Sequence, residues 1–183
     1  MTELKVQSAT PVEVWCQDEG RFGLKPILRK VWGLQGQRPR APGQMRYEWL
    51  YVYGFVRPTT GQTYWLMLPT VNTEAMNLAL AEFARDIGAG RDKCIVLVLD
   101  NAGWHCSKTL VVPTGIELVY LPAATPELQP AEHLWPLLRE SVANQTFANL
   151  DLLQEKLVKR CLQLADQGDM IQSATNFHWL PTA

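Results

Sequence analysis

The sequence lacks the features of membrane, secreted and zinc-binding proteins. No apolar run approaches the roughly 18 residues that span a bilayer, and residues 1–10 lack the basic-then-apolar pattern of a signal peptide. Its four cysteines, Cys16, Cys94, Cys106 and Cys161, form no CxxC pair, and Cys16 and Cys94 fall in apolar runs that predict buried strands. A metal or disulfide framework is therefore not indicated, and we expect a cytoplasmic protein.

Acidic residues are missing from one stretch, although the formal net charge of the 183-residue chain is only -1. Between Arg21 and Arg46 there is no Asp or Glu, and such a segment can neutralise DNA phosphates. A solvated loop is the alternative interpretation. The candidate contacts to the DNA backbone are Arg21, Lys25, Arg29, Lys30, Arg38 and Arg40.

What is present is an ordinary globular composition, with 47% hydrophobic and 19% charged residues, which excludes a disordered chain. The predicted elements are strands at 11–17, 48–57 and 62–68, a helix from Thr73 to about Ile87, a strand at 94–99, a short helix from Trp104 to about Leu110, a strand at 116–121, a helix with Pro130 in its first turn, and a helix at about 150–166. This order predicts an α/β domain with an antiparallel meander followed by parallel strands. No internal repeat or low-complexity linker divides the chain, so we expect one domain.

Several local signals fix where these elements begin and end. A turn over 18–20 closes the first strand, and a hairpin turn over 58–61 joins the next two. Thr73 is a candidate cap for its helix. Pro136 lies inside the helix that follows Pro130 and should kink it, because proline leaves the carbonyl four residues back without a donor. The tail from Asp169 is expected to be partly helical at most.

Three carboxylates stand at the ends of predicted elements. Asp18 follows the first strand, Asp100 follows the continuously apolar strand CIVLVL, and Glu132 lies in the first turn of the helix after the last strand. Ligands gather at the carboxyl edge of open α/β sheets. If the strands at 11–17 and 94–99 are neighbours, the two aspartates lie side by side and Glu132 reaches the same edge.

Three acids at one edge repel one another, and a divalent cation removes this repulsion. Ligation by oxygen alone favours Mg²⁺ or Mn²⁺ over zinc. Two such ions can stabilise the attacking and leaving oxygens of a phosphodiester. Each acid alone has a plain alternative: Asp18 and Asp100 are also typical of turns, and Glu132 of a helix start. The prediction depends on their occurring together.

The same blocks resemble the three signatures of DDE transposases, in the bacterial insertion-sequence branch of the mariner superfamily. They are Asp18-Glu19, then Asp100-Asn101 with His105 five residues on, then the run PELQPAEHLW that contains Glu132. The similarity extends from about residue 12 to the tail at 176–179. It implies a mixed five-stranded RNase H-like sheet flanked by helices.

The resemblance also implies a function and a site. Asp18, Asp100 and Glu132 become the catalytic metal ligands for two Mg²⁺ or Mn²⁺ ions, and the reaction is DNA cleavage at transposon ends followed by strand transfer. The partner is DNA, which a dimer of the protein would bind. The active protein would be associated with the nucleoid. Asn101 and His105 are possible auxiliary residues.

The side chains near these blocks leave alternatives open. His105 either contacts the scissile phosphate or orients Asp100, or else it caps a helix or lies on the surface. His133 is not expected to bind metal. Trp104 and Trp135 are candidates for stacking on an unpaired base, although core packing is favoured for Trp135, which lies on the apolar stripe of its helix.

Two departures from the family pattern bear on function. Gln129 stands where the family has an asparagine. The first predicted strand begins at residue 11, so we expect the N-terminal helix-turn-helix recognition region of such transposases to be absent, and a separately encoded subunit to be a possible partner. A standalone nuclease and a catalytically silent DNA-binding or oligomerising remnant remain the alternatives.

Overall fold

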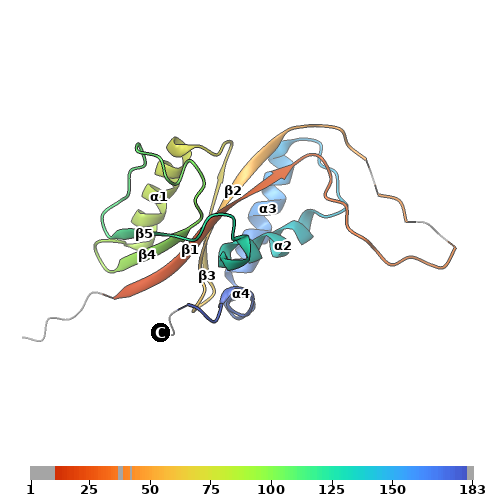
Figure 1. Cartoon of the computed structure of the whole chain (residues 1–183). Coiled ribbons are helices and arrows are strands. Elements are labelled where there is room, and N and C mark those ends of the chain that lie inside the picture. The colour runs from red at the N-terminus through yellow and green to blue at the C-terminus, as the bar shows by residue number, and fades with distance from the viewer. Residues whose placement is uncertain (1–10, 37–38, 42, 181–183) are drawn as a thin grey trace, which may run out of the picture.

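The computed structural model describes residues 11–36, 39–41 and 43–180. Five strands form one mixed sheet in the order β3-β2-β1-β4-β5 (Figure 1). They are β1 Val12–Gly23, β2 Trp49–Arg57, β3 Gln62–Leu68, β4 Cys94–Leu99 and β5 Ile116–Tyr120. β1, β2 and β3 pair antiparallel, while β1 with β4 and β4 with β5 pair parallel. The predicted meander followed by parallel strands is confirmed.

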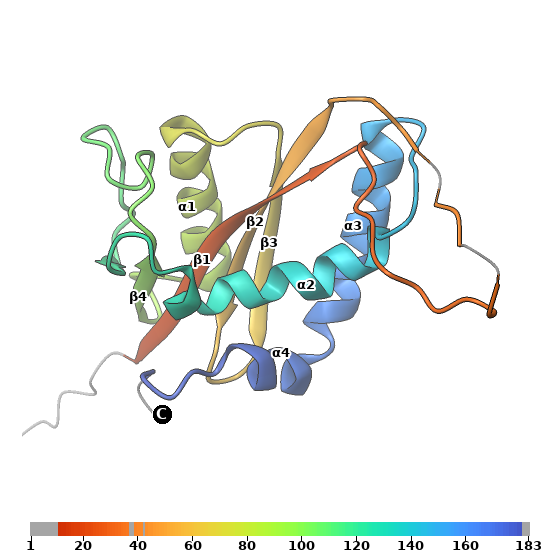
Figure 2. The same ribbon diagram turned by 45° about the vertical axis from the view of Figure 1, so that its right-hand side comes forward.

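Helices cover the two faces of the sheet unequally (Figure 2). The helices are α1 Thr73–Ile87, α2 Leu134–Arg139, α3 Leu150–Ala165 and α4 Gly168–Thr175, with 3₁₀ turns η1 Pro126–Leu128, η2 Pro130–His133 and η3 Glu140–Val142. α1 lies on one face, and α2, α3 and α4 lie on the other. Successive residues of a strand point to opposite faces. Trp15 of β1 therefore packs with α1, while Cys16 packs in the core that includes α2 and α3.

β1 does not end at Asp18 as predicted, and the turn predicted over 18–20 is wrong. The strand continues to Gly23 because β2 pairs with it along that length, from Cys16↔Val56 to Gly23↔Trp49. β4 pairs with β1 only as far as Cys16↔Val98. Asp18 therefore lies inside β1 but beyond the last residue paired with β4, so it still stands at the carboxyl edge of the parallel strands.

Three local predictions are corrected. Asn72, not Thr73, caps α1, because its side-chain oxygen accepts the amide of Ala75, and Gly88 ends the helix with a φ of 80°. The helix predicted over 104–110 is absent, and turns occupy this described segment. Cys94 is exposed rather than buried, at the first position of β4.

The segment after η1 is less regular than the predicted helix with a kink. It begins as the 3₁₀ turn η2 and becomes α-helical only at α2. Pro136 has no N–H to donate to the carbonyl of Glu132, which removes one α-helical hydrogen bond at this point. The predicted apolar stripe is nevertheless correct, since Ala131, Leu134, Trp135 and Leu138 are all buried.

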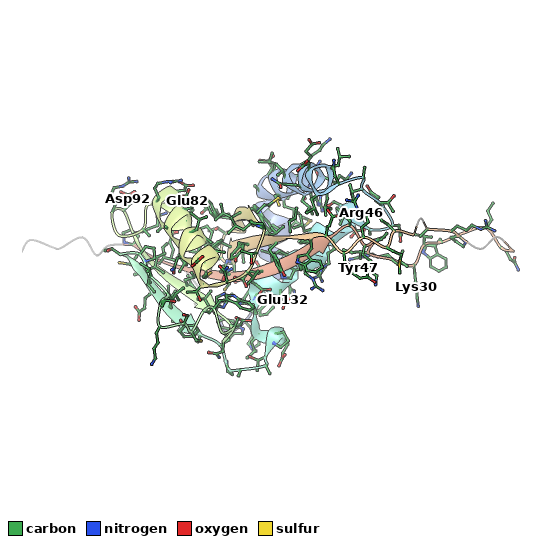
Figure 3. The ribbon with its side chains drawn as sticks, turned by 90° about the horizontal axis from the view of Figure 1, so that it is seen from above. Lys30, Arg46, Tyr47, Glu82, Asp92 and Glu132 are labelled. Carbon is green, nitrogen blue, oxygen red and sulfur yellow. The ribbon has the colours of Figure 1, made fainter. Side chains whose placement is uncertain are left out.

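The basic stretch runs out from the sheet between β1 and β2, and Lys30, Arg46 and Tyr47 lie along it in Figure 3. It contains no helix or strand of its own between β1 and Trp49 in its described residues. Arg38 lies outside the described residues. Within the described ranges, no helix is long and apolar enough to cross a membrane.

Candidate active site

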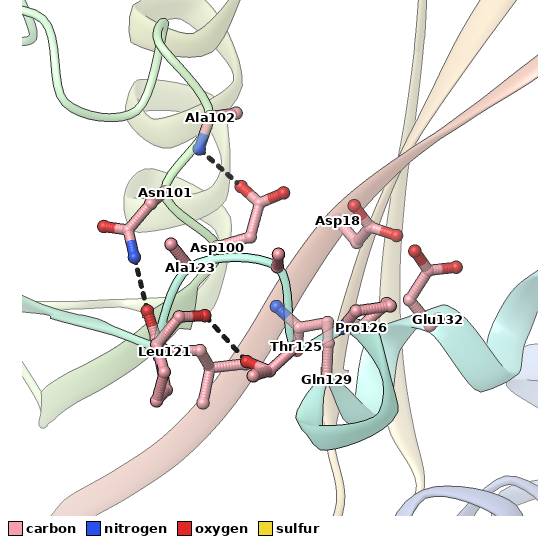
Figure 4. A pocket seen from close by; sticks show the side chains of 12 residues that line it. Asp18, Asp100, Asn101, Ala102, Leu121, Ala123, Thr125, Pro126, Gln129 and Glu132 are labelled. Carbon is pink, nitrogen blue, oxygen red and sulfur yellow. Dashed lines mark hydrogen bonds between the residues drawn. The ribbon is translucent and has the colours of Figure 1, made fainter.

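Asp18, Asp100 and Glu132 line one pocket of about 270 Å³ (Figure 4). They come from β1, from the end of β4 and from η2. Because Cys16 is level with Val98 in the parallel pair, Asp18 and Asp100 are each two residues further on and lie at the same level of the sheet. The close-up shows the three carboxylates converging from three separate elements. The predicted convergence of these side chains is thus what the fold produces.

Asp18 is held by a tryptophan from the helical layer. Trp135 Nε1 donates to Asp18 Oδ2 over 2.6 Å, and both side chains are buried. The indole fits against the sheet because two glycines make room for it: a Cβ at Gly20 would lie 2.7 Å from the ring, and one at Gly54 3.0 Å. Trp135 belongs to the core as predicted, but its bond to Asp18 was not foreseen. A buried indole N–H that needs an acceptor was the available signal.

The electrostatics of the pocket are unbalanced around Asp18. The pKa of Asp18 is raised to about 7, because burial and the nearby charges of Glu132 and Glu19 raise it by more than the hydrogen bond from Trp135 lowers it. No Lys or Arg occurs among the described residues that line the pocket. Ionisation of Asp18 is therefore disfavoured, and a bound cation would favour it.

Asp100 has the opposite environment, because a buried histidine contacts it. His105 is fully buried, and its Nδ1 lies 2.7 Å from Asp100 Oδ1. This hydrogen bond lowers the pKa of Asp100. Burial alone would lower the pKa of His105, but its hydrogen bonds to Asp100 and Glu19 raise it to about 9. Of the predicted alternatives for His105, the geometry places it behind Asp100, away from the surface.

Glu132 is positioned by the turn that precedes it. Gln129 is buried, and its Nε2 donates to the backbone oxygen of Gln17, one residue before Asp18, over 3.1 Å. This bond joins the segment that carries Glu132 to the strand that carries Asp18. Asn101, the other possible auxiliary residue, lines the pocket and donates to the backbone oxygen of Leu121.

The donor set fits a hard divalent cation in its chemistry. The three side chains supply only carboxylate oxygens, which suit Mg²⁺ or Mn²⁺, and the raised pKa of Asp18 marks a negative charge that no neighbouring cation balances. Among the described residues, no three His, Cys, Asp or Glu side chains lie close enough together to hold a metal ion between them. The pocket therefore supplies ligand atoms of the right chemistry, and the three carboxylates would have to draw closer together to share a cation.

The remaining candidates lie outside this pocket. His133 stacks edge-on against Phe177, 4.9 Å between ring centroids, so its ring serves packing. Trp104 is partly buried, and its Nε1 lies 3.3 Å from Glu19 Oε2. Arg21 is exposed at the far end of β1 and lies over the ring of Trp49, while Lys25 lies over Tyr47. Arg29 forms an ion pair with Glu140 at 3.8 Å.

Comparison with known proteins gives consistent results. Residues 13–154 match the family described as DDE superfamily endonuclease. An uncharacterized protein, y4pE/y4sA of Sinorhizobium fredii (strain NBRC 101917 / NGR234), is 37% identical over 132 residues, which is 72% of this chain and 96% of that protein.

Solved structures of Mos1 mariner transposase share the fold. The paired-end complex with Mn has a TM-score of 0.59 at 17% identity and covers 92% of this chain and 57% of that one. The isolated catalytic domain of Mos1 has a TM-score of 0.53 at 14% identity and covers 92% of this chain and 84% of that one. The chain spans about half the length of the Mos1 chains in such complexes, 56% in the strand transfer complex.

The fold is therefore the RNase H-like fold of a transposase catalytic domain, as the resemblance implied. The bacterial insertion-sequence branch stays a prediction. With the family match covering most of its length, the chain belongs to the DDE superfamily endonucleases.

Proposed function

We propose that this chain cuts DNA strands at transposon ends and joins the freed 3′ ends to target DNA. One observation carries the proposal: carboxylates from three elements far apart in the sequence line the same pocket. Membership of an endonuclease family supports the cleavage step. Strand transfer rests on the shared fold and on the Mos1 strand transfer complex among the similar structures.

Asp18, Asp100 and Glu132 are the residues that would hold the metal. If two Mg²⁺ or Mn²⁺ ions were held there with the substrate, they would lower the pKa of a bound water or 3′-hydroxyl and stabilise negative charge on the departing oxygen. Mos1 complexes with Mg and with Mn are among the similar structures, which supports the use of a divalent cation.

The protein's own part is to hold these acids in place. Trp135 fixes one oxygen of Asp18, His105 fixes one oxygen of Asp100, and Gln129 ties the turn that carries Glu132 to β1. Fixed oxygens lose little freedom when a ligand binds, so these bonds orient Asp18 and Asp100 before DNA arrives. Glu132 is partly exposed and faces the pocket without such a bond among the described residues, which makes it the most adjustable of the three.

DNA is the proposed partner, bound by a dimer. The similar Mos1 structures are paired-end complexes with transposon ends, and the basic stretch starts at the same strand as Asp18. We propose that Arg21, Lys25, Arg29, Lys30, Arg38 and Arg40 contact phosphates, which predicts binding that weakens steeply with added salt. A separately encoded subunit that recognises the transposon ends is part of the proposal, and it is tested by whether this chain alone prefers one DNA sequence.

The test is Mn²⁺-dependent nicking of supercoiled plasmid by the purified chain. Asp100→Asn should reduce nicking to the background of the assay, because it removes a charge from the pocket while keeping the side chain's shape. Asp166→Asn is the matched control: this acid is exposed at the end of α3, and its variant should nick like the wild type. Nicking that survives in Asp100→Asn would overturn the assignment of the pocket.

A second assay separates a transposase from a simple nuclease. A labelled duplex with a pre-cut 3′ end is offered together with plasmid, and joined products are scored. We expect joined products that require Asp18, Asp100 and Glu132. Cleavage with no joining would leave a nuclease, while no metal-dependent activity of either kind would indicate a silent remnant.

A further inference from the structure

Glu19, the neighbour of Asp18 in β1, is an acid that does not line the pocket. Its side chain is only 5% exposed. Its Oε1 accepts from Gln17 Nε2 over 2.9 Å and lies 3.0 Å from His105 Nε2, and its Oε2 lies 3.3 Å from Trp104 Nε1. Adjacent strand residues point to opposite faces, so Asp18 faces the pocket layer and Glu19 faces away. The carboxylate of Glu19 thus faces three nitrogen atoms of the protein, so its oxygens are not available to a ligand in the pocket.

His105 connects this hidden acid to the pocket. Its ring is fully buried, and each ring nitrogen faces a carboxylate: Nδ1 lies 2.7 Å from Asp100 Oδ1 and Nε2 lies 3.0 Å from Glu19 Oε1. Both contacts are hydrogen bonds only if both nitrogens carry a proton. Trp104 Nε1 lies 3.0 Å from His105 Nε2 and 3.3 Å from Glu19 Oε2, so the indole N–H is directed at the junction between the ring and the acid. The ring therefore cannot turn without breaking a bond to a charge.

The bond from His105 also selects which oxygen of Asp100 is available. Oδ1 receives both His105 Nδ1 and, over 3.0 Å, the amide of Ala102. Oδ2 has no hydrogen bond among the described residues, and the Asp100 side chain is 51% exposed. One oxygen is thus anchored, and the other faces the pocket.

We propose that Glu19 is a positioning residue that acts through His105 to present the free oxygen of Asp100 to the divalent cation. This inference rests on the function proposed above. Glu19 holds the far nitrogen of the ring, the near nitrogen holds Asp100 Oδ1, and Oδ2 is left at a fixed angle. Outer partners of metal ligands act in this way, and losing one weakens metal affinity about 10- to 100-fold.

The test measures Mn²⁺ binding to the DNA-free protein by calorimetry. Glu19→Ala should weaken Mn²⁺ binding at least about tenfold. Glu19→Gln keeps an oxygen that can accept from His105 but loses the charge, so we expect a smaller loss of about threefold. Glu13→Gln is the matched control, because Glu13 is a buried acid on the same face of the same strand, paired with Lys93 and Arg57 instead of His105. Its affinity for Mn²⁺ should equal that of the wild type.

Two further measurements separate positioning from a general loss of structure. In an Asp100→Asn background, Glu19→Gln should cause no additional loss of Mn²⁺ affinity, because the residue through which it acts has been changed. Urea denaturation of every variant shows whether it is folded. If Glu19→Ala does not fold, the Mn²⁺ affinity of Glu19→Gln decides whether Glu19 is a positioning residue.

Failure of this inference is distinguishable from failure of the proposed function. If the wild type binds Mn²⁺ in an Asp100-dependent way and folded Glu19→Gln binds it equally well, Glu19 is not a positioning residue and the pocket assignment stands. If the wild type neither binds Mn²⁺ nor nicks DNA, the proposed function falls and this inference falls with it.

Discussion

The start and the middle of β1 each bury an acid, and the surroundings of the two acids differ in charge. Near the start of the strand, Glu13 is paired with Lys93 Nζ at 2.8 Å and Arg57 Nη1 at 3.0 Å. Further along, Asp18 receives one neutral donor, Trp135 Nε1, and has acids as its charged neighbours. Burial raises the pKa of Glu13, but the hydrogen bond from Lys93 and the positive charges of its partners bring it below the ordinary value of 4.5. Burial raises the pKa of Asp18 to about 7.

The difference shows how a buried acid that serves the fold can be told from one that serves a ligand. At Glu13 the protein supplies the positive charge itself, so the pair is complete without a partner. At Asp18 the charged neighbours are all negative, although both acids are almost inaccessible to solvent. Perturbed acids without a structural counter-charge are typical of functional sites. This contrast in charged neighbours distinguishes the part of β1 that faces the pocket from the start of the strand.

The largest predicted effect is that Asp18→Asn removes activity without loss of stability, while Glu13→Gln lowers stability without loss of activity. Asp18→Asn should bring Mn²⁺-dependent nicking to background while leaving the metal-free protein at least as stable as the wild type at pH 8. Glu13→Gln should keep nicking within about threefold and lose stability instead. Nicking assays and urea denaturation of the same two variants measure both. Loss of activity in both variants would mean that Glu13 and Asp18 do not differ in function.

The pH dependence of stability should show the cost of ionising the buried Asp18 side chain. Without metal, the folded pKa of about 7 exceeds the unfolded value of 3.8. The contribution of Asp18 to the free energy of unfolding is therefore fully present below pH 3.8 and is lost as the pH rises through about 7. The loss amounts to at most about 4 kcal/mol. It is measured as the stability difference between the wild type and Asp18→Asn across this range.

Saturating Mn²⁺ provides the control for that measurement. A bound cation stabilises the ionised acid, so the decline between pH 3.8 and about 7 should become smaller when Mn²⁺ is present. A decline of the same size with and without Mn²⁺ would show that the cation does not interact with Asp18.

Glu13 should show the opposite pH dependence and a smaller effect. The substitution Glu13→Gln leaves Lys93 and Arg57 without the carboxylate that they share. The side chains of Lys93 and Arg57 are each 24% exposed. We expect a loss of about 2 kcal/mol in the free energy of unfolding. Because the folded pKa is lowered from 4.5, this contribution is present above pH 4.5 and is lost as the pH falls below it. Urea denaturation at pH 7 and pH 3 tests both the size and the sign.

The smallest predicted effect concerns the donor to Asp18. Trp135→Phe removes the indole N–H but keeps an aromatic ring against Gly20 and Gly54, so we expect a loss of about 1 kcal/mol. It should also raise the pKa of Asp18 further, which weakens Mn²⁺ binding at pH 7. The matched control is Trp65→Phe, whose indole donates to Thr63 Oγ1 in the same aromatic cluster. Equal Mn²⁺ affinity in the two variants would show that the hydrogen bond from Trp135 does not contribute to metal binding.

The sheet and the pocket were predictable from patterns of short range. The apolar run CIVLVL, the hairpin before α1 and the acids at 18, 100 and 132 each stand in a recognisable local context. The predicted end of β1 at residue 17 was wrong because a polar triplet was interpreted as a turn. Pairing with β2 keeps that triplet extended, and such pairing depends on residues some thirty positions away. The helix predicted over 104–110 is replaced by turns, and His105 in this segment contacts Asp100 and Glu19.

The sequence alone determined the strand order along the chain, the apolar faces and the family, because hydrophobic periodicity and adjacent motif residues are local properties. Only the tertiary structure decided which acids are neutralised. Glu13 meets Lys93, Asp18 meets Trp135 and Glu19 meets His105 across sequence separations of 80 or more. The pKa of a buried acid depends on charges within a few ångströms, and which charges lie there is set by packing of the whole sheet rather than by the residues beside it in the chain.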